Sequence, residues 1–116
     1  MKYRFKFNNA GYPLCIVEAP HDLFGQFLSF EIVPTRIKEI ELAIEKFKST
    51  DNMEVEVERD DAVLTIFPNG EVDLDMWAED EEARDSKKIT ISDFEKVFFD
   101  WKNFLENKWE GYERCK

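Results

Sequence analysis

Two segments of this chain alternate strictly between acidic and apolar residues, with an apolar segment between them. In residues 53–58, methionine and valine alternate with glutamate, and in residues 71–76 carboxylates alternate with valine, leucine and methionine. The segment between them, Ala62–Phe67, is apolar at nearly every position, and Pro68-Asn69-Gly70 then signals a turn. A period of two predicts strands with one buried and one exposed face. The pattern therefore predicts a three-strand antiparallel meander with residues 62–67 as its central strand.

This meander would carry much of the chain's acid on one side. If its apolar residues face the core, the carboxylates of both outer strands lie on the opposite face, in two rows about 10 Å apart. Residues 51–85 hold 14 of the 26 acidic residues and 2 of the 16 basic ones, so the net charge of −10 originates there. A field concentrated in one place attracts cationic partners and accelerates their encounter.

The first third of the chain predicts further strands. Aromatic and basic residues alternate over residues 2–7, and Asn8–Gly11 supplies residues that tolerate positive φ. We therefore expect a hairpin with a return strand over Tyr12–Ala19. Polar and apolar residues alternate again in Leu23–Val33, which predicts a third strand there.

Two amphipathic helices complete the predicted fold. Pro34-Thr35 suits a helix start, and apolar residues then recur at helical spacing as far as Phe47. A short strand at Lys88–Ile91 would precede the last helix, for which Ser92–Glu95 predicts a capping box. The prediction is one α+β domain, residues 1–116, with a mainly antiparallel sheet of about six strands and two amphipathic helices. Its order is ββ(β)-α-βββ(β)-α.

The sequence offers little for catalysis. Asp73 and Asp75 followed by Glu79 lack a calcium-loop pattern, and strand alternation produces rows of acids rather than a converging cage. His21, the only histidine, precedes Asp22 and is expected in a turn rather than as a general base. No nucleophile or phosphate-binding motif occurs. We therefore expect no enzyme, no metal and no cofactor.

The composition also bears on partners and compartment. A pI near 4.6 disfavours nucleic acid and anionic membranes. Charges at every second position of residues 2–6 predict no signal peptide, and no segment reaches transmembrane length. Cys15 and Cys115 lack metal-ligand spacing, so we expect two free thiols in a cytoplasmic protein, with a bridge between them as the alternative.

The acidic rows allow three interpretations. They could be solvated strand residues that keep the protein soluble and protect sheet edges. The row Lys2, Arg4 and Lys6 could lie beside an acidic strand and neutralise it. They could also form a binding face for a basic partner, and Trp77, which shares the parity of Asp73, would then be an exposed anchor unless its ring enters the core.

The closing stretch Ile89–Leu105, ITISDFEKVFFDWKNFL, contains the predicted capped helix and bears a tryptophan. In this stretch, its size and its charge, the chain resembles small acidic immunity proteins of bacterial toxin systems, particularly those of contact-dependent growth inhibition. The resemblance implies a cytoplasmic bacterial protein that binds and neutralises a cognate toxin domain, with a basic nuclease as the expected class. These families differ in fold, so the resemblance transfers no site residues.

A second resemblance is to the YacL-like family of small uncharacterised enterobacterial proteins. The opening Met1-Lys2-Tyr3-Arg4-Phe5, the segment Leu64–Met76 with Asn69-Gly70-Glu71-Val72, and the final helix are similar in order and length. The segment around His21 and Gly25 is similar at a different spacing. This resemblance implies a housekeeping interaction module without a toxin partner.

The acidic rows and the first resemblance together predict an immunity protein, with the housekeeping module as the alternative. Charge complementarity with a few aromatic anchors would hold the toxin, and the pattern indicates no oligomeric state. The predicted partner-binding residues are Asp73, Asp75, Trp77, Glu79, Asp80, Glu81, Glu82, Glu54, Glu56 and Glu58.

Overall fold

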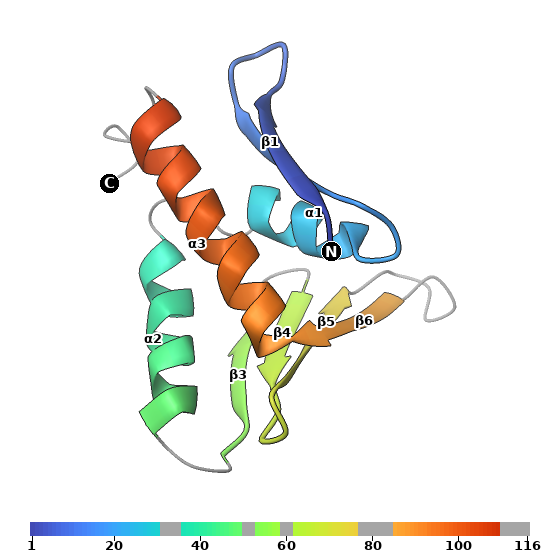
Figure 1. The fold of residues 1–116 in the computed structure, drawn as a ribbon, viewed down its shortest axis with the longest axis vertical. Helices are drawn as coiled ribbons and strands as arrows, with labels where there is room; N and C mark the ends of the chain where they lie inside the picture. The colour runs from blue at the N-terminus through green and yellow to red at the C-terminus, as the bar shows by residue number, and fades with distance from the viewer. Residues whose placement is uncertain (31–35, 50–52, 59–61, 77–84, 110–116) are drawn as a thin grey trace. The chain divides into compact units, whose positions relative to one another are not determined.

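The computed structural model describes residues 1–30, 36–49, 53–58, 62–76 and 85–109. Within these segments the protein is of the α+β class, with six antiparallel strands in two sheets and three helices in the order ββ-α-α-ββββ-α (Figure 1). The chain divides into two compact units. We call Met1–Ile37 with Glu95–Lys116 the hairpin unit, and Lys38–Phe94 the sheet unit. None of the helices in the described segments is both long and apolar enough to span a bilayer.

The predicted N-terminal hairpin is confirmed. β1 (Tyr3–Phe7) pairs antiparallel with β2 (Pro13–Val17). The Asn8 side chain organises the turn, because its Oδ1 accepts hydrogen bonds from the backbone N–H groups of Ala10 and Tyr12, each at 2.9 Å. Gly11 has a φ of 84°, a conformation that only glycine adopts without strain.

The third strand predicted over Leu23–Val33 is wrong wherever the structure describes this segment. Asp22–Phe30 forms a helix, α1, and residues 31–33 lie outside the described residues. Phe24, Phe27 and Leu28 are all fully buried, at the i, i+3, i+4 spacing of one helix face. The polar residues between them also permitted an alternating pattern, which would have sent Phe27 and Leu28 to opposite faces.

Helix α1 packs unusually close to β2. A Cβ atom added at Gly25 would lie 2.7 Å from the Cys15 carbonyl oxygen and 2.9 Å from the Val17 nitrogen. One turn later, Ser29 Oγ accepts a hydrogen bond from the Cys15 N–H at 2.8 Å and donates to the Gly25 carbonyl at 2.8 Å. Glycine and serine thus let a helix backbone lie almost directly on a strand backbone.

The C-terminal helix α3 (Ile91–Lys108) contacts the aromatic side of β1. The ring centroid of Phe5 lies 5.7 Å from that of Trp101 and 5.2 Å from that of Phe104. The hydroxyl of Tyr3 donates a hydrogen bond to Asp100 Oδ2. Aromatic pairs at these separations contribute beyond their buried area, so they join the two ends of the chain within the hairpin unit.

The predicted cap of this helix is displaced by two residues. Thr90 Oγ1 accepts a hydrogen bond from the Asp93 backbone N–H at 3.1 Å, which is the geometry of an N-cap. Ser92 therefore lies inside the helix, and the expectation that it caps α3 is wrong. Thr90 and Asp93 have the same spacing two residues earlier, and the Thr90 hydroxyl caps the helix there.

The sheet unit contains the predicted meander. β3 (Val55–Glu58), β4 (Ala62–Ile66), β5 (Glu71–Met76) and β6 (Asp85–Thr90) pair antiparallel in the order β3-β4-β5-β6. The turn after β4 is closed by the Gly70 N–H donating to the Phe67 carbonyl at 2.9 Å, with Gly70 at a φ of 86°. β6 is longer than the strand expected at Lys88–Ile91.

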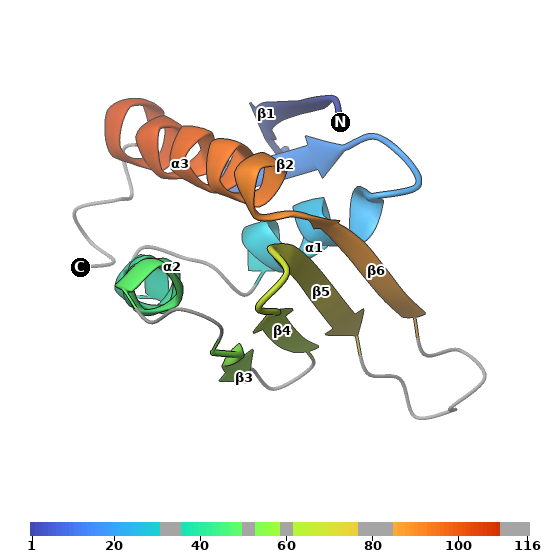
Figure 2. The ribbon, with the colours of Figure 1, turned by 60° about the horizontal axis from the view of Figure 1, so that its bottom comes forward.

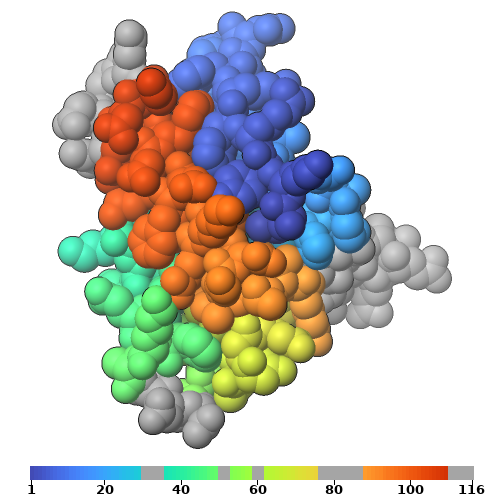
Figure 3. All heavy atoms as spheres, in the orientation of Figure 1, coloured from blue at the N-terminus to red at the C-terminus, as the bar shows by residue number. Residues whose placement is uncertain are grey.

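One face of this sheet is buried and the other is not. The buried strand residues are Val55, Ala62, Leu64, Ile66, Val72, Leu74 and Ile89. Helix α2 (Ile37–Ser49) runs beside the outer strand β3 in the views of Figures 1 and 2, and it lies at the surface in Figure 3. Ile40 and Ile44 of α2 are buried. The predicted helix start at Pro34-Thr35 lies outside the described residues.

Candidate functional site

The register of the sheet places both acidic rows on one face. Glu56 of β3 lies opposite Thr65 of β4, which lies opposite Asp73 of β5. Residues paired in this way point to the same side, so Glu58 and Asp75 share that side in the next row. Counting only described strand residues, five carboxylates lie here, and we call them the acidic face: Glu56, Glu58, Glu71, Asp73 and Asp75.

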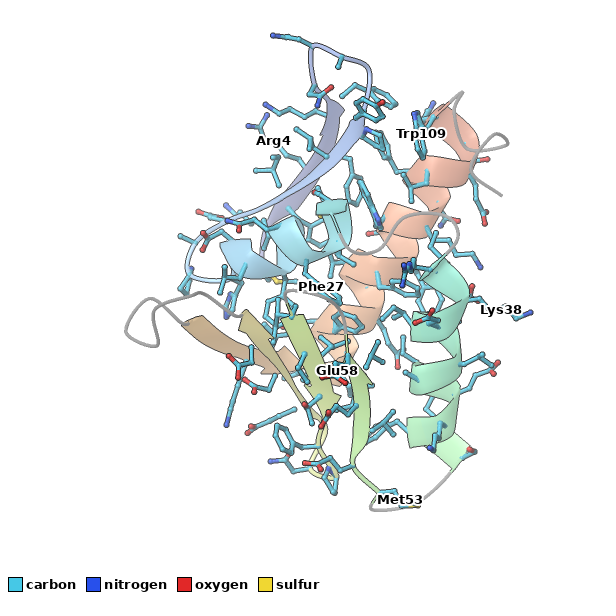
Figure 4. The ribbon with its side chains drawn as sticks, turned by 180° about the vertical axis from the view of Figure 1, so that it is seen from behind. Arg4, Phe27, Lys38, Met53, Glu58 and Trp109 are labelled. Carbon is cyan, nitrogen blue, oxygen red and sulfur yellow. The ribbon has the colours of Figure 1, made fainter. Side chains whose placement is uncertain are left out.

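The carboxylates of the acidic face differ in accessibility. Glu56 and Glu58 are exposed, and so is Glu54, which precedes β3; Figure 4 shows Glu58 on this strand. Asp73 and Asp75 are half-buried, and Oδ1 of Asp75 is shielded from solvent. A partner can therefore reach the β3 row more directly than the β5 row. The other predicted residues, Trp77, Glu79, Asp80, Glu81 and Glu82, lie outside the described residues.

A lysine from the fourth strand joins this face. Lys88 lies opposite Asp73 in the β5–β6 register, and its Nζ is 3.9 Å from Glu71 Oε2 and 5.6 Å from the ring centroid of Phe67. Its side chain is 60% exposed, so the ion pair contributes at most about 1 kcal/mol. Among the described strand residues, the acidic face thus brings together five carboxylates and one lysine.

The basic row Lys2, Arg4 and Lys6 does not neutralise a neighbouring acidic strand in the described part of the chain, because β1 pairs with β2. Lys2 and Arg4 line a small pocket together with Glu18 in the hairpin unit. The sequence did not predict that Lys88 joins this face, because the alternation of side chains along a strand does not show which residue of β6 lies opposite which residue of β5.

A groove beside β3 was also missed. It has a volume of about 360 Å³ and lies between α2 and β3. The residues that line it are Glu39, Leu42, Ala43, Lys46, Val55, Glu56, Val57 and Glu58. Leu42 is 53% exposed, and Met53, just before β3, is 51% exposed. The sequence did contain a sign of this groove, because Leu42 is an apolar residue that lies outside the buried apolar stripe of Ile37, Ile40 and Ile44.

Two residues of types common in catalysis, His21 and Cys15, lie in the hairpin unit. His21 lies in a turn, as predicted: its backbone N–H donates to the Glu18 carbonyl, and its own carbonyl accepts from the Phe24 N–H. Cys15 is a buried free thiol, and burial raises its pKa to about 12, so it stays protonated at neutral pH. Cys115 lies outside the described residues. Within the described segments, no three His, Cys, Asp or Glu side chains converge on a possible metal position.

No protein-family model, curated protein or solved structure matches this chain.

Proposed function

We propose that this protein is a cytoplasmic immunity protein that binds a cognate toxin domain of basic character, with a nuclease as the expected class. The observation that carries the proposal is the gathering of five carboxylates, with a single lysine, on one face of the described sheet. The active-site cleft of a nuclease is positive because it holds a phosphate backbone. An acidic protein surface that enters such a cleft blocks the substrate's place.

The energetics favour a partner over an isolated acidic surface. Two carboxylates two positions apart on a strand, such as Glu56 and Glu58, lie about 7 Å apart and repel by about 0.6 kcal/mol in water. A cationic partner would be attracted to both carboxylates and would offset that repulsion. Complementary charge also steers the encounter, so the association rate should be high and should fall as salt is raised.

The two exposed carboxylates of β3 give the sharpest test. Co-expression with the product of the adjoining gene should restore growth if that product is the toxin, and the purified proteins should form a 1:1 complex. Glu56→Lys and Glu58→Lys should each slow association at least about tenfold at low salt, because repulsion replaces attraction at the interface. Glu18→Lys is the matched control, since it changes the net charge equally at an exposed position of the hairpin unit.

The outcomes separate the hypotheses. Absence of binding and of growth rescue would refute the immunity function and leave a housekeeping interaction module. Binding whose rate is the same for Glu56→Lys and for Glu18→Lys would refute the acidic face as the contact surface.

A further inference from the structure

The outer strand β3 has one side without a strand neighbour. It pairs with β4 through all four of its residues, Val55–Glu58, and it ends the order β3-β4-β5-β6. On its other side, no strand among the described residues pairs with it. Such an edge presents backbone N–H and C=O groups that an extended chain can bind.

The groove follows this edge. Successive residues of a strand point to opposite faces, yet all four residues of β3 line the same groove. This is possible only if the groove runs along the side of the strand. The opposite wall is a single stripe of α2, because Glu39, Leu42, Ala43 and Lys46 are spaced i, i+3, i+4 and i+7. Figures 2 and 4 show α2 beside β3 from two directions.

The two sides of the groove differ chemically. Glu56 and Glu58 extend the acidic face to the edge of the sheet, and both are exposed. Val55 and Val57 point to the other face, and Leu42 of α2 stands across the groove with half its surface exposed. A strand added here would place alternate side chains about 4.5–5.5 Å from the glutamates and the remaining ones near the apolar residues.

We infer that the groove between α2 and β3 binds an extended segment of a partner protein, in which basic and apolar residues alternate, as an additional strand of the sheet. The inference rests on the proposed function only in taking the partner to be a basic protein. Backbone hydrogen bonds supply affinity in this mode, and the alternating side chains supply specificity.

A second copy of this chain fits the groove less well. Pairing β3 with β3 would bring Glu56 and Glu58 of one copy against the same residues of the other. Like charges directly opposite each other on neighbouring strands are destabilising. Charge therefore selects a basic segment over self-association.

The test uses the full-length, isotope-labelled protein and a capped eight-residue peptide in which lysine and valine alternate. A peptide of the same composition with four lysines followed by four valines is the control, because its pattern cannot match both sides of the groove. The alternating peptide should shift the backbone amide signals of Val55–Glu58 and of the α2 stripe, and it should bind at least fivefold more tightly than the block peptide.

Two variants locate the binding. Leu42 is exposed, so Leu42→Arg can be accommodated. Leu42→Arg and Glu58→Lys should each weaken binding of the alternating peptide at least fivefold, whereas Glu18→Lys should change the affinity for this peptide less than twofold. Circular dichroism checks that each variant is folded. If Leu42→Arg does not fold, Glu58→Lys alone locates the binding site. Equal binding of both peptides, shifts confined to β5 and β6, or a dimer that Glu58→Lys strengthens would each overturn the inference.

The peptide test is independent of the toxin. If the peptide binds along β3 while co-expression gives no growth rescue, the immunity function fails and the edge site stands. If rescue occurs and the peptide leaves β3 unaffected, the edge site fails and the immunity function stands.

Discussion

Gly25→Ala sets two physical effects against each other. Within a helix, alanine is more favourable than glycine by about 1 kcal/mol, so helix propensity alone predicts that the variant is more stable. The packing of α1 on β2 predicts the opposite. The new Cβ would lie 2.7 Å from the Cys15 carbonyl oxygen, 2.9 Å from the Val17 nitrogen and 3.1 Å from Val17 Cγ2.

The magnitude follows from what must move. Two of the three obstructing atoms belong to the backbone of β2, so no side-chain rotation relieves the overlap. Overpacking typically costs about 1–3 kcal/mol, and a backbone obstacle places this site at the upper end. After the gain in helix propensity is subtracted, we expect the free energy of unfolding to fall by about 2 kcal/mol. For a domain of this size that corresponds to a melting temperature lower by roughly 8 °C.

Urea denaturation followed by circular dichroism measures this change. Gln26→Ala is the matched control, because Gln26 is exposed on the same helix and its replacement should alter the free energy of unfolding by less than about 0.5 kcal/mol. A Gly25→Ala variant as stable as the parent, or more stable, would show that α1 does not lie this close to β2.

Three further predictions concern the cap, the buried thiol and the lysine of the acidic face. Thr90→Ala should lower the free energy of unfolding by about 1 kcal/mol while Ser92→Ala changes it by less than half as much; the reverse order in urea denaturation would restore Ser92 as the cap. In a Cys115→Ser background, Cys15 should react with a thiol reagent far more slowly in the folded than in the unfolded protein at pH 8. The pKa of Cys15 rises from 9.0 to about 12 on folding, so above about pH 9 the thiol ionises in the unfolded protein first and the free energy of unfolding should decline. Rapid labelling of the folded protein would contradict both expectations. Lys88→Gln should change the free energy of unfolding by less than about 1 kcal/mol, because the ion pair between Lys88 and Glu71 is exposed to solvent; a larger loss would mean that this ion pair is shielded from water.

Local patterns predicted the strands of the N-terminal hairpin and of the meander, because the alternation of side chains along a strand is a local property. The alternation in residues 53–58 and 71–76 assigned side chains to faces, and the register of β3, β4 and β5 agrees with that assignment. The turns at Asn8–Gly11 and at Gly70 were also predicted, since positive φ depends on the residue itself. Long helices with clear apolar stripes were equally recognisable.

The segment that became α1 shows where local patterns are insufficient. Its residues are compatible with either period, and the choice depends on Gly25 and Ser29 meeting the backbone of β2. The hydrogen bond between Ser29 and Cys15 joins two residues that are 14 positions apart in the sequence. A short, ambiguous segment takes the conformation that its neighbours stabilise.

For the candidate site too, some features could be predicted from local sequence patterns and others depend on tertiary contacts. Residue order predicted that the carboxylates of two strands share one face, because side chains alternate along a strand and the apolar residues of both strands were expected to face the core; the registers of β3, β4 and β5 agree with it. It could not establish that Lys88 lies opposite Asp73, that the β5 acids are half-buried, or that α2 forms a groove with the edge of β3. Those features depend on pairing and packing between distant segments, and such contacts are fixed only when the whole chain folds.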